Sequence, residues 1–146
     1  MNQDYPRFHL ALPVTDLPAA VAFYQDVLGC TQGRSSGRWV DFDFWGHQLV
    51  LHLVDELAAV ATNPVDGEKV PASHFGPILP WQDMQPLIER LEAAAVEFVI
   101  APTRRFADRR GEQITLFISD PCGNHLEFKS FRNIDMLFAT DGLDYP

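Results

Sequence analysis

The stretch FHLALPVTDLPAAVAFYQDVLG, residues 8–29, predicts a strand that is followed at once by a helix. Residues 8–12 form a short apolar run of strand length. Thr15 or Asp16 can cap the N-terminus of the helix, and Gly29 lies just past its end. This strand–helix unit is the starting point for the fold because the same order occurs a second time in the chain.

The second occurrence begins with the apolar run HFGPILPW, residues 74–81, and continues with DMQPLIERLEAAAVE, residues 83–97. Asp83 is the expected cap of this second helix. A short motif, Pro-x-x-Asp, starts at Pro13 in the first unit and at Pro80 in the second. An internal repeat of this kind constrains the fold more than any single element does.

Strands follow each of the two helices. In GRWVDFDFWGHQLVLHLV, polar and apolar residues alternate over residues 38–45, Gly46 breaks the pattern, and HQLVLHLV continues as a second strand. This pattern predicts a hairpin. In the second half the predicted strands are FVIAP (98–102), QITLFIS (113–119) and NHLEFKSF (124–131), the last two joined by the turn DPCG (120–123).

Short turns between successive strands favour antiparallel pairing, so the repeat predicts an α+β fold of two paired βαβββ modules. We expect these modules to form a curved mixed sheet around a central cleft, within a single domain of residues 1–146. Module one spans about 6–55, a linker about 56–73 (with a short helical piece expected at its start), module two about 74–131, and a C-terminal tail about 132–146. The apolar residues of that tail are expected to cover the mouth of the cleft or to pack against a partner subunit.

Composition narrows the class of protein. The chain has 146 residues, a formal net charge of −9 and no apolar run of membrane length, so we expect a cytoplasmic protein that binds neither nucleic acid nor membrane. Cys30 and Cys122 have no metal-type spacing and are interpreted as inert structural thiols. A local basic cluster is either a solvated loop or a site for a small anion; it comprises Arg104, Arg105, Arg109 and Arg110.

Four polar residues occupy positions of the repeat that could converge on one point. His9 and His74 lie in the first strands of the two modules, and His52 and Glu127 lie in the last strands. Imidazole and carboxylate together suit a divalent transition metal, and two His with one carboxylate is the ligand set of non-haem Fe(II) oxygen chemistry. A metal would also explain Glu127, since a carboxylate in an apolar strand is costly to bury without a compensating charge.

Each of these residues also has a purely structural explanation. A single His in an apolar strand is commonly a hydrogen-bonded core residue, and Glu127 could pair with an Arg or lie at an exposed strand end. His125 lies two residues before Glu127 and therefore on the same face of a regular strand. It is a candidate for proton transfer, for substrate contact or for metal binding, and equally for a surface position beside the turn. His47 has the opposite parity to His52 and is expected to point away from the cleft.

The stretches FHLALPVTDLPAAVAFYQDVLG and DPCGNHLEF resemble the vicinal oxygen chelate superfamily, which includes glyoxalase I, the fosfomycin and bleomycin resistance proteins and the extradiol dioxygenases. The resemblance covers roughly residues 6–131. Within the superfamily, RWVDFDFWGHQLVLHL, SHFGPIL and GEQITLFISDPCGNHLEFKSF are most similar to a small bacterial group of predicted extradiol-type dioxygenases.

The resemblance implies a metal held by His9, His74 and Glu127, and a homodimer. Glyoxalase-type members add a last-strand ligand in module one, often Glu; His52 stands there in this chain, either as a fourth ligand or as a neighbour of a three-residue site. The leading prediction is a metal-dependent dioxygenase with Fe(II), in which His125 or His52 handles protons while the metal chelates vicinal oxygens of a catechol-like small molecule. Mn(II), Ni(II) and Zn(II) are the alternative metals. The alternative functions are a glyoxalase-type lyase or isomerase and a metal-free module that binds a small molecule such as an antibiotic.

Overall fold

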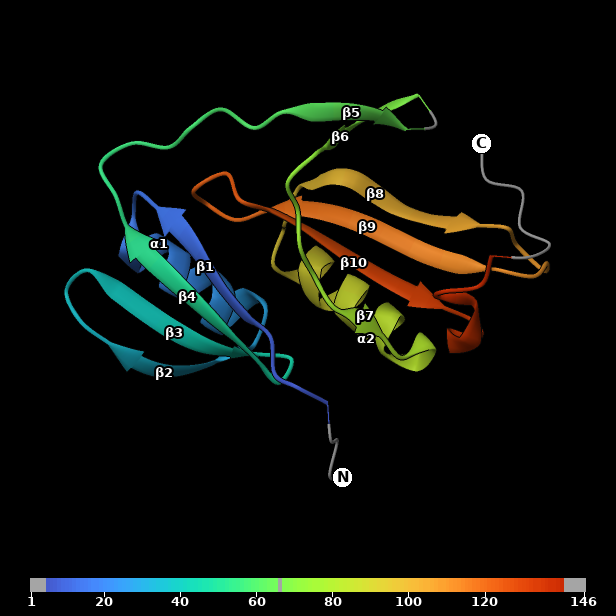
Figure 1. Ribbon diagram of the computed structural model, residues 1–146, viewed down its shortest axis with the longest axis horizontal. Helices are drawn as coiled ribbons and strands as arrows, with labels where there is room; N and C mark the ends of the chain where they lie inside the picture. The colour runs from blue at the N-terminus through green and yellow to red at the C-terminus, as the bar shows by residue number, and fades with distance from the viewer. Residues whose placement is uncertain (1–4, 66, 141–146) are drawn as a thin grey trace. The chain divides into compact units, whose positions relative to one another are not determined.

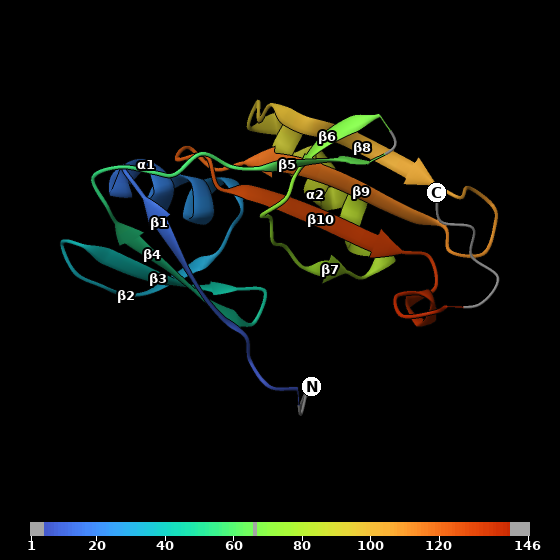
Figure 2. The same cartoon turned by 45° about the horizontal axis from the view of Figure 1, so that its top comes forward.

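The structure is a computed structural model that describes residues 5–65 and 67–140. Its internal contacts divide the chain into two compact units (Figures 1 and 2). Unit 1 comprises Met1–Ala58 together with Asp120–Asn124, and unit 2 comprises Ala59–Ser119 together with His125–Pro146. The last part of the expected tail, 141–146, lies outside the described residues.

Unit 1 has the order strand, helix and three strands, as predicted for the first module. One four-stranded sheet has the order β1-β4-β3-β2, in which β1 and β4 are parallel and the other pairs are antiparallel. Its elements are β1 (His9–Val14), α1 (Leu17–Ala22), the π-helical turn η1 (Phe23–Val27), β2 (Thr31–Ser35), β3 (Trp39–Phe44) and β4 (His47–Leu53).

The ends of the first helix are set by residues that the sequence singles out. Asp16 is the N-cap, and its Oδ1 accepts a hydrogen bond of 3.0 Å from Ala19 N, as a capping carboxylate should. Gly29 has φ 77°, a left-handed conformation that glycine adopts at no steric cost. The helix is not regular throughout, because its second half is the π-helical turn η1.

The two faces of the unit 1 sheet differ in chemistry. Alternation along β3 and β4 places one set of side chains against α1, which packs on β3 and β4 (Figure 1); these buried residues are Val40, Phe42, Phe44, Leu49 and Leu51. The opposite face carries Asp41, Gln48 and His52, and His9 lies beside Gln48 in the β1–β4 ladder. The polar candidates of unit 1 therefore share the face that the helix does not cover.

The segment Asp120–Asn124 belongs to unit 1 through a buried polar contact. Tyr24 is 0% exposed, and its hydroxyl donates a hydrogen bond of 2.9 Å to Asp120 Oδ2. Asn124 Nδ2 donates to Pro13 O at 3.0 Å. These bonds tie the predicted turn 120–123 and the residue after it to η1 and to the end of β1.

Unit 2 repeats the module with a second four-stranded sheet, ordered β7-β10-β9-β8, and with α2 packed against β10 (Figure 1). The β7–β10 pair is parallel and the other pairs are antiparallel. Its elements are β5 (Thr62–Val65), β6 (Glu68–Pro71), β7 (Ile78–Leu79), α2 (Trp81–Ala93), β8 (Phe98–Arg105), β9 (Gln113–Ser119), β10 (His125–Phe131) and the 3-10 turn η2 (Ile134–Met136).

Two local predictions for the second half are wrong. The expected linker contains no helical piece at its start and instead forms the β5–β6 hairpin, whose turn includes Gly67 at φ 80°. Asp83 does not cap α2, because the helix begins at Trp81 after Pro80 and Asp83 falls inside its first turn. A carboxylate there still interacts favourably with the positive end of the helix dipole.

The α+β class and the repeated βαβββ order are confirmed by both units. Cys30 and Cys122 are buried and are not joined in a disulfide, as expected of structural thiols. In the tail, Ile134 and Phe138 are exposed side chains of unit 2. Among the described helices, none is long and apolar enough to cross a membrane.

Candidate metal centre

His74 and Glu127 lie next to each other in unit 2. His74 precedes β7, and Glu127 lies in β10. An isolated parallel bridge between Phe75 and Leu126 joins the segment before β7 to β10. The His74 Nε2 atom lies 3.1 Å from Glu127 Oε2, and Lys129 Nζ lies 3.5 Å from the other carboxylate oxygen. The structure thus brings together one predicted imidazole ligand and the predicted carboxylate ligand.

The orientation of the His74 ring is fixed from two sides. Its Nδ1 atom lies 2.7 Å from the carbonyl oxygen of Pro71, and the ring packs edge-on against Phe117, with centroids 5.0 Å apart. A carbonyl only accepts hydrogen bonds, so Nδ1 carries a proton, and in the neutral ring Nε2 has a bare lone pair. That lone pair is directed at the side where Glu127 lies.

Gly76 makes this juxtaposition possible. A Cβ atom at Gly76 would lie 1.7 Å from the backbone oxygen of Glu127, which is far inside contact distance. Only glycine lets the chain after His74 lie so close to β10. Glycine at position 76 is therefore required by backbone packing and not by turn conformation.

The pair fits a divalent metal by distance and by chemistry. Two neighbouring ligands of an octahedral ion, each about 2.1 Å from the metal, lie about 3.0 Å apart. The distance of 3.1 Å between His74 Nε2 and Glu127 Oε2 matches that value. Imidazole nitrogen with carboxylate oxygen is a donor set that suits Fe, Mn, Ni and Zn. The same distance also suits a charge-assisted hydrogen bond when the imidazole is doubly protonated.

His9 is held in unit 1 by a chain of polar side chains. Its Nδ1 atom lies 2.7 Å from Gln48 Oε1, and Gln48 Nε2 donates to Asp41 Oδ2 at 3.2 Å. Asp41 is buried and also accepts a hydrogen bond from the backbone N–H of Arg34. Sequence reasoning assigned no role to Asp41 or Gln48, although a carboxylate within the apolar alternation of 38–45 is a signal that could have drawn attention to Asp41.

His52 and His125 occupy different surroundings. His52 is exposed and pairs with Pro13 and Trp39 across the sheet, whereas His9 pairs with Gln48 four residues earlier in β4. Four strand residues span about 13 Å, so the sheet of unit 1 does not bring His52 and His9 together. His125 is half-buried in β10, two residues before Glu127 and on the same face of that strand.

The register of the two ladders corrects the predicted equivalence of His52 and Glu127. His9 pairs with Gln48 in unit 1, and the bridge from Phe75 to Leu126 places His74 beside His125 in unit 2. Matching His9 to His74 therefore matches Gln48 to His125, Val50 to Glu127 and His52 to Lys129. The predicted equivalence is wrong by two residues, and Val50 stands where a second carboxylate would be expected.

Within residues 5–65 and 67–140, no three His, Cys, Asp or Glu side chains gather into one cluster. His9 belongs to unit 1, while His74 and Glu127 belong to unit 2. The role of His52 and of His125 in metal binding or catalysis stays a prediction.

A family model described as the Glyoxalase/Bleomycin resistance protein/Dioxygenase superfamily matches residues 8–128. The chain belongs to this superfamily. The predicted family is confirmed, while the extradiol-type subgroup stays a prediction. No curated protein matches the chain significantly.

Solved structures of the superfamily share its fold. A glyoxalase/bleomycin resistance protein/dioxygenase from Alicyclobacillus acidocaldarius has a TM-score of 0.78 and 32% identity, covering 94% of this chain and 100% of that one. A fosfomycin resistance protein from Listeria monocytogenes has a TM-score of 0.67 and 18% identity, over 92% and 98% of the two chains. A lactoylglutathione lyase from Agrobacterium tumefaciens has a TM-score of 0.62 and 23% identity, over 96% and 100%.

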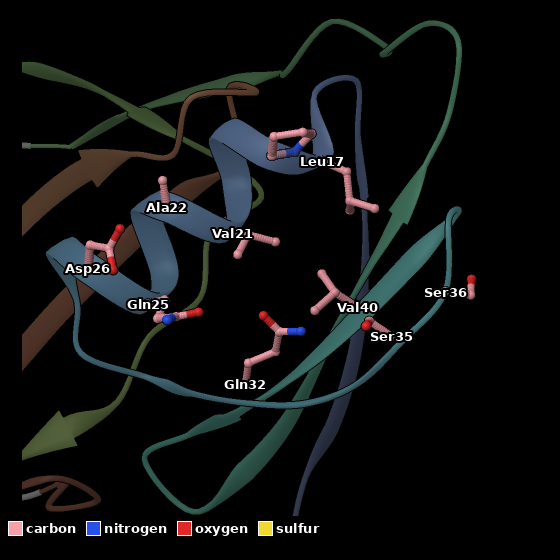
Figure 3. Close-up of a pocket in the computed structure, with 10 residues that line it drawn as sticks. Leu17, Val21, Ala22, Gln25, Asp26, Gln32, Ser35, Ser36 and Val40 are labelled. Carbon is pink, nitrogen blue, oxygen red and sulfur yellow. The ribbon is translucent and has the colours of Figure 1, made fainter.

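This superfamily member also has a pocket of about 440 Å³ in unit 1, between α1 with η1 and the edge strand β2 (Figure 3). Its lining includes Val21, Gln25, Gln32 and Val40. Val40 belongs to the helix-covered face of the sheet, so the pocket lies on the opposite face from His9 and Gln48. None of the predicted ligands lines it.

Arg104 and Arg110 of the basic cluster form contacts within the protein. Arg104 Nε donates to Glu112 Oε1 at 2.9 Å, and Arg104 Nη2 lies 3.4 Å from Asp108 Oδ1. Arg110 Nε donates to Met136 Sδ at 3.2 Å. Arg104 therefore organises the loop between β8 and β9, which favours the structural interpretation over a site for a small anion.

Proposed function

We propose that this chain is a metal-dependent enzyme of dioxygenase type, which acts on a small catechol-like substrate through two vicinal oxygens. The observation that carries the proposal is the contact of 3.1 Å between His74 Nε2 and Glu127 Oε2. Two His and one carboxylate, here His9, His74 and Glu127, make a ligand set that leaves positions open for other molecules.

The register in β4 favours this ligand set over the glyoxalase type. A glyoxalase-type site is expected to have a further carboxylate in the last strand of module one. Val50 is the residue that corresponds to Glu127 there, and its side chain has no donor atom for a metal. The proposed set therefore has one carboxylate, as in non-haem Fe(II) oxygenases.

When bound, a divalent metal, Fe(II) in the leading proposal, supplies Lewis-acid polarisation of the substrate oxygens and electron transfer with O₂. The protein's own part is to orient the ligands and to move protons. Pro71 O holds the ring of His74, while Lys129 offsets part of the charge of Glu127. His125, on the same face of β10 as Glu127, is the proposed group for proton transfer.

Metal stoichiometry tests the proposal first. Protein reconstituted anaerobically with Fe(II), Mn(II), Ni(II) or Zn(II) is expected to bind about one ion per chain. Glu127→Gln should weaken binding because it removes the anionic ligand without changing its shape. Glu89→Gln makes the same change at an exposed helical position and should have no effect. Failure of all four metals to bind would overturn the proposal and leave the metal-free binding module.

Reaction assays then separate the two enzymatic functions. Consumption of O₂ with catechols as probes, lost in Glu127→Gln and kept in Glu89→Gln, supports a dioxygenase. If the protein binds metal and converts thiol adducts of 2-oxoaldehydes but consumes no O₂, its function is that of a glyoxalase-type lyase and not of a dioxygenase.

A further inference from the structure

A line of three side chains leads from a backbone amide of β2 to His9. The Arg34 N–H donates to Asp41 Oδ1, Gln48 Nε2 lies 3.2 Å from Asp41 Oδ2, and Gln48 Oε1 lies 2.7 Å from His9 Nδ1. The four residues come from four different strands of one sheet, so the line runs across the sheet and not along one strand. Each group in it has a defined hydrogen-bonding character.

The direction of every bond in this line follows from its first member. A backbone N–H only donates, and an aspartate carboxylate only accepts. Gln48 must therefore turn its NH₂ group to Asp41, and this places its carbonyl oxygen opposite His9. An amide oxygen only accepts, so His9 Nδ1 must be the nitrogen that carries the proton.

We propose that Gln48, oriented by Asp41, is a positioning residue that holds His9 in the Nδ1-protonated tautomer and leaves Nε2 as its ligating nitrogen. The tautomer itself is independent of any metal. Its consequence for metal affinity rests on the proposed function, because it requires His9 to be a ligand.

The surroundings of Asp41 are built for this arrangement. The residue is 6% exposed, although it lies on the face of the sheet that α1 does not cover. A Cβ atom at Gly33 would lie 2.2 Å from Asp41 Oδ1, so the carboxylate fits against a backbone that has no side chain at that point. Gly33 thus lets β2 cover Asp41 and donate to it from the next residue.

His74 provides an internal comparison in unit 2. Its Nδ1 atom is also opposite an acceptor, but that acceptor is the backbone carbonyl of Pro71. In both proposed imidazole ligands Nδ1 therefore lies opposite an acceptor, which is a main-chain carbonyl for His74 and a replaceable side chain for His9. Outer groups that orient a metal-bound His typically contribute 10- to 100-fold to metal affinity.

Asp41→Asn is the decisive variant because it should reverse the donor–acceptor direction of the hydrogen bonds from residue 41 through Gln48 to His9. The Arg34 N–H should keep the oxygen of the introduced amide, so the NH₂ group faces Gln48. The Arg34 guanidinium, whose Nε lies 3.6 Å from Asp41 Oδ2, is 80% exposed and can turn to solvent. Gln48 then turns its own oxygen to that NH₂ group and its own NH₂ group to His9. With a donor opposite Nδ1, the proton of His9 moves to Nε2. The substitution at Asp41 thus changes the tautomer of His9 through Gln48, without contacting the ring itself.

The readout is the protonation of each ring nitrogen in the metal-free protein, measured by long-range ¹H–¹⁵N correlation of labelled histidine. The tautomer is taken from spectra in which the His9 ring has a single protonated nitrogen. We expect Nδ1–H for His9 in the wild type and Nε2–H in Asp41→Asn, with His74 unchanged in both. Asp43→Asn makes the same change on the same strand. Asp43 pairs with Gln48 in the β3–β4 ladder, but its carboxylate accepts from Gly46 N, so this variant should leave the tautomer of His9 as it is.

Metal titration supplies the second readout. Asp41→Asn should weaken binding about 10- to 100-fold, whereas Asp43→Asn should leave the affinity unchanged. If Asp41→Asn does not fold, Gln48→Met removes the acceptor instead and should abolish the dominance of the Nδ1–H form. Nε2–H for His9 in the wild type, or an unchanged tautomer in the variants, would overturn the proposal. Failure of the wild type to bind metal, with the tautomers as stated, would overturn only the proposed function.

Discussion

Replacement of Tyr24 by Phe should remove a buried hydrogen bond while keeping the ring in place. The Tyr24 hydroxyl donates to Asp120 Oδ2 at 2.9 Å, and the two residues are 0% and 3% exposed. The Asp120 carboxylate accepts three further hydrogen bonds, from Cys122 N, Asn124 N and Asn124 Nδ2, each 2.9 Å long. The carboxylate therefore loses one of four donors in Tyr24→Phe.

The size of the effect follows from this inventory. A hydrogen bond to a charged group contributes about 1.5–3 kcal/mol to the free energy of unfolding. Because the other three donors stay, and because Phe leaves no cavity beyond the missing oxygen, we expect a loss of about 2 kcal/mol. For a chain of this length that corresponds to a fall in Tm of about 4–8 °C. Urea unfolding followed by circular dichroism measures the difference.

The dependence of stability on alkaline pH provides a second test of Tyr24. Burial, followed by the charge and the hydrogen bond of Asp120, raises the pKa of Tyr24 well above 10.0. The folded state thus keeps a proton that the unfolded chain releases, so this contribution is complete below pH 10.0 and is lost as the pH rises above it. Tyr24→Phe should lose stability less steeply above that pH than the wild type does.

Tyr5→Phe is the matched control, since Tyr5 is 78% exposed and the chemical change is the same. It should alter the free energy of unfolding by no more than about 0.5 kcal/mol. Equal urea midpoints for the two variants, or an alkaline loss in Tyr24→Phe as steep as in the wild type, would refute the assigned role of the Tyr24–Asp120 bond.

Two further predictions concern unit 2. Gly76→Ala should lower stability and weaken metal binding by tenfold or more, because its Cβ would lie 1.7 Å from Glu127 O, whereas Gly37→Ala, with open space around it, serves as the control. Burial alone would raise the pKa of Glu112, but hydrogen bonds from Arg104 and from a backbone N–H lower it below 4.5. Its contribution is thus present above pH 4.5 and lost as the pH falls below it, so urea midpoints of Glu112→Gln should be lower than wild type at neutral pH and should decline less steeply in acid.

The elements with clear periodicity could be predicted from the sequence. The alternation over 38–45 and the break at Gly46 correspond to β3, the turn and β4, and Asp16 caps α1 as expected. The βαβββ order predicted a strand before β3, but the residues of β2 were not located, because TQGRS are all exposed and have no apolar alternation. It exists through backbone pairing with β3, a property that the pattern of side chains does not record.

The site was predicted in part for a similar physical reason. Parity along a strand indicates only which face of the sheet a side chain occupies. Position along the ladder depends on which residues of neighbouring strands pair, and that register placed Val50, not His52, as the counterpart of Glu127. Asp41 and Gln48 were overlooked because their importance lies in a bond across strands.

The membership of residues 120–124 in unit 1 has a consequence for how the protein folds. The Tyr24–Asp120 bond joins residues 96 positions apart, so unit 1 is complete only after most of unit 2 has been synthesised. Closing the loop between Tyr24 and Asp120 costs conformational entropy before its contacts form, which slows folding. We therefore expect that the two βαβββ modules do not fold one after the other as independent halves. A repeat that looks divisible in sequence is therefore expected to unfold and refold as one cooperative chain.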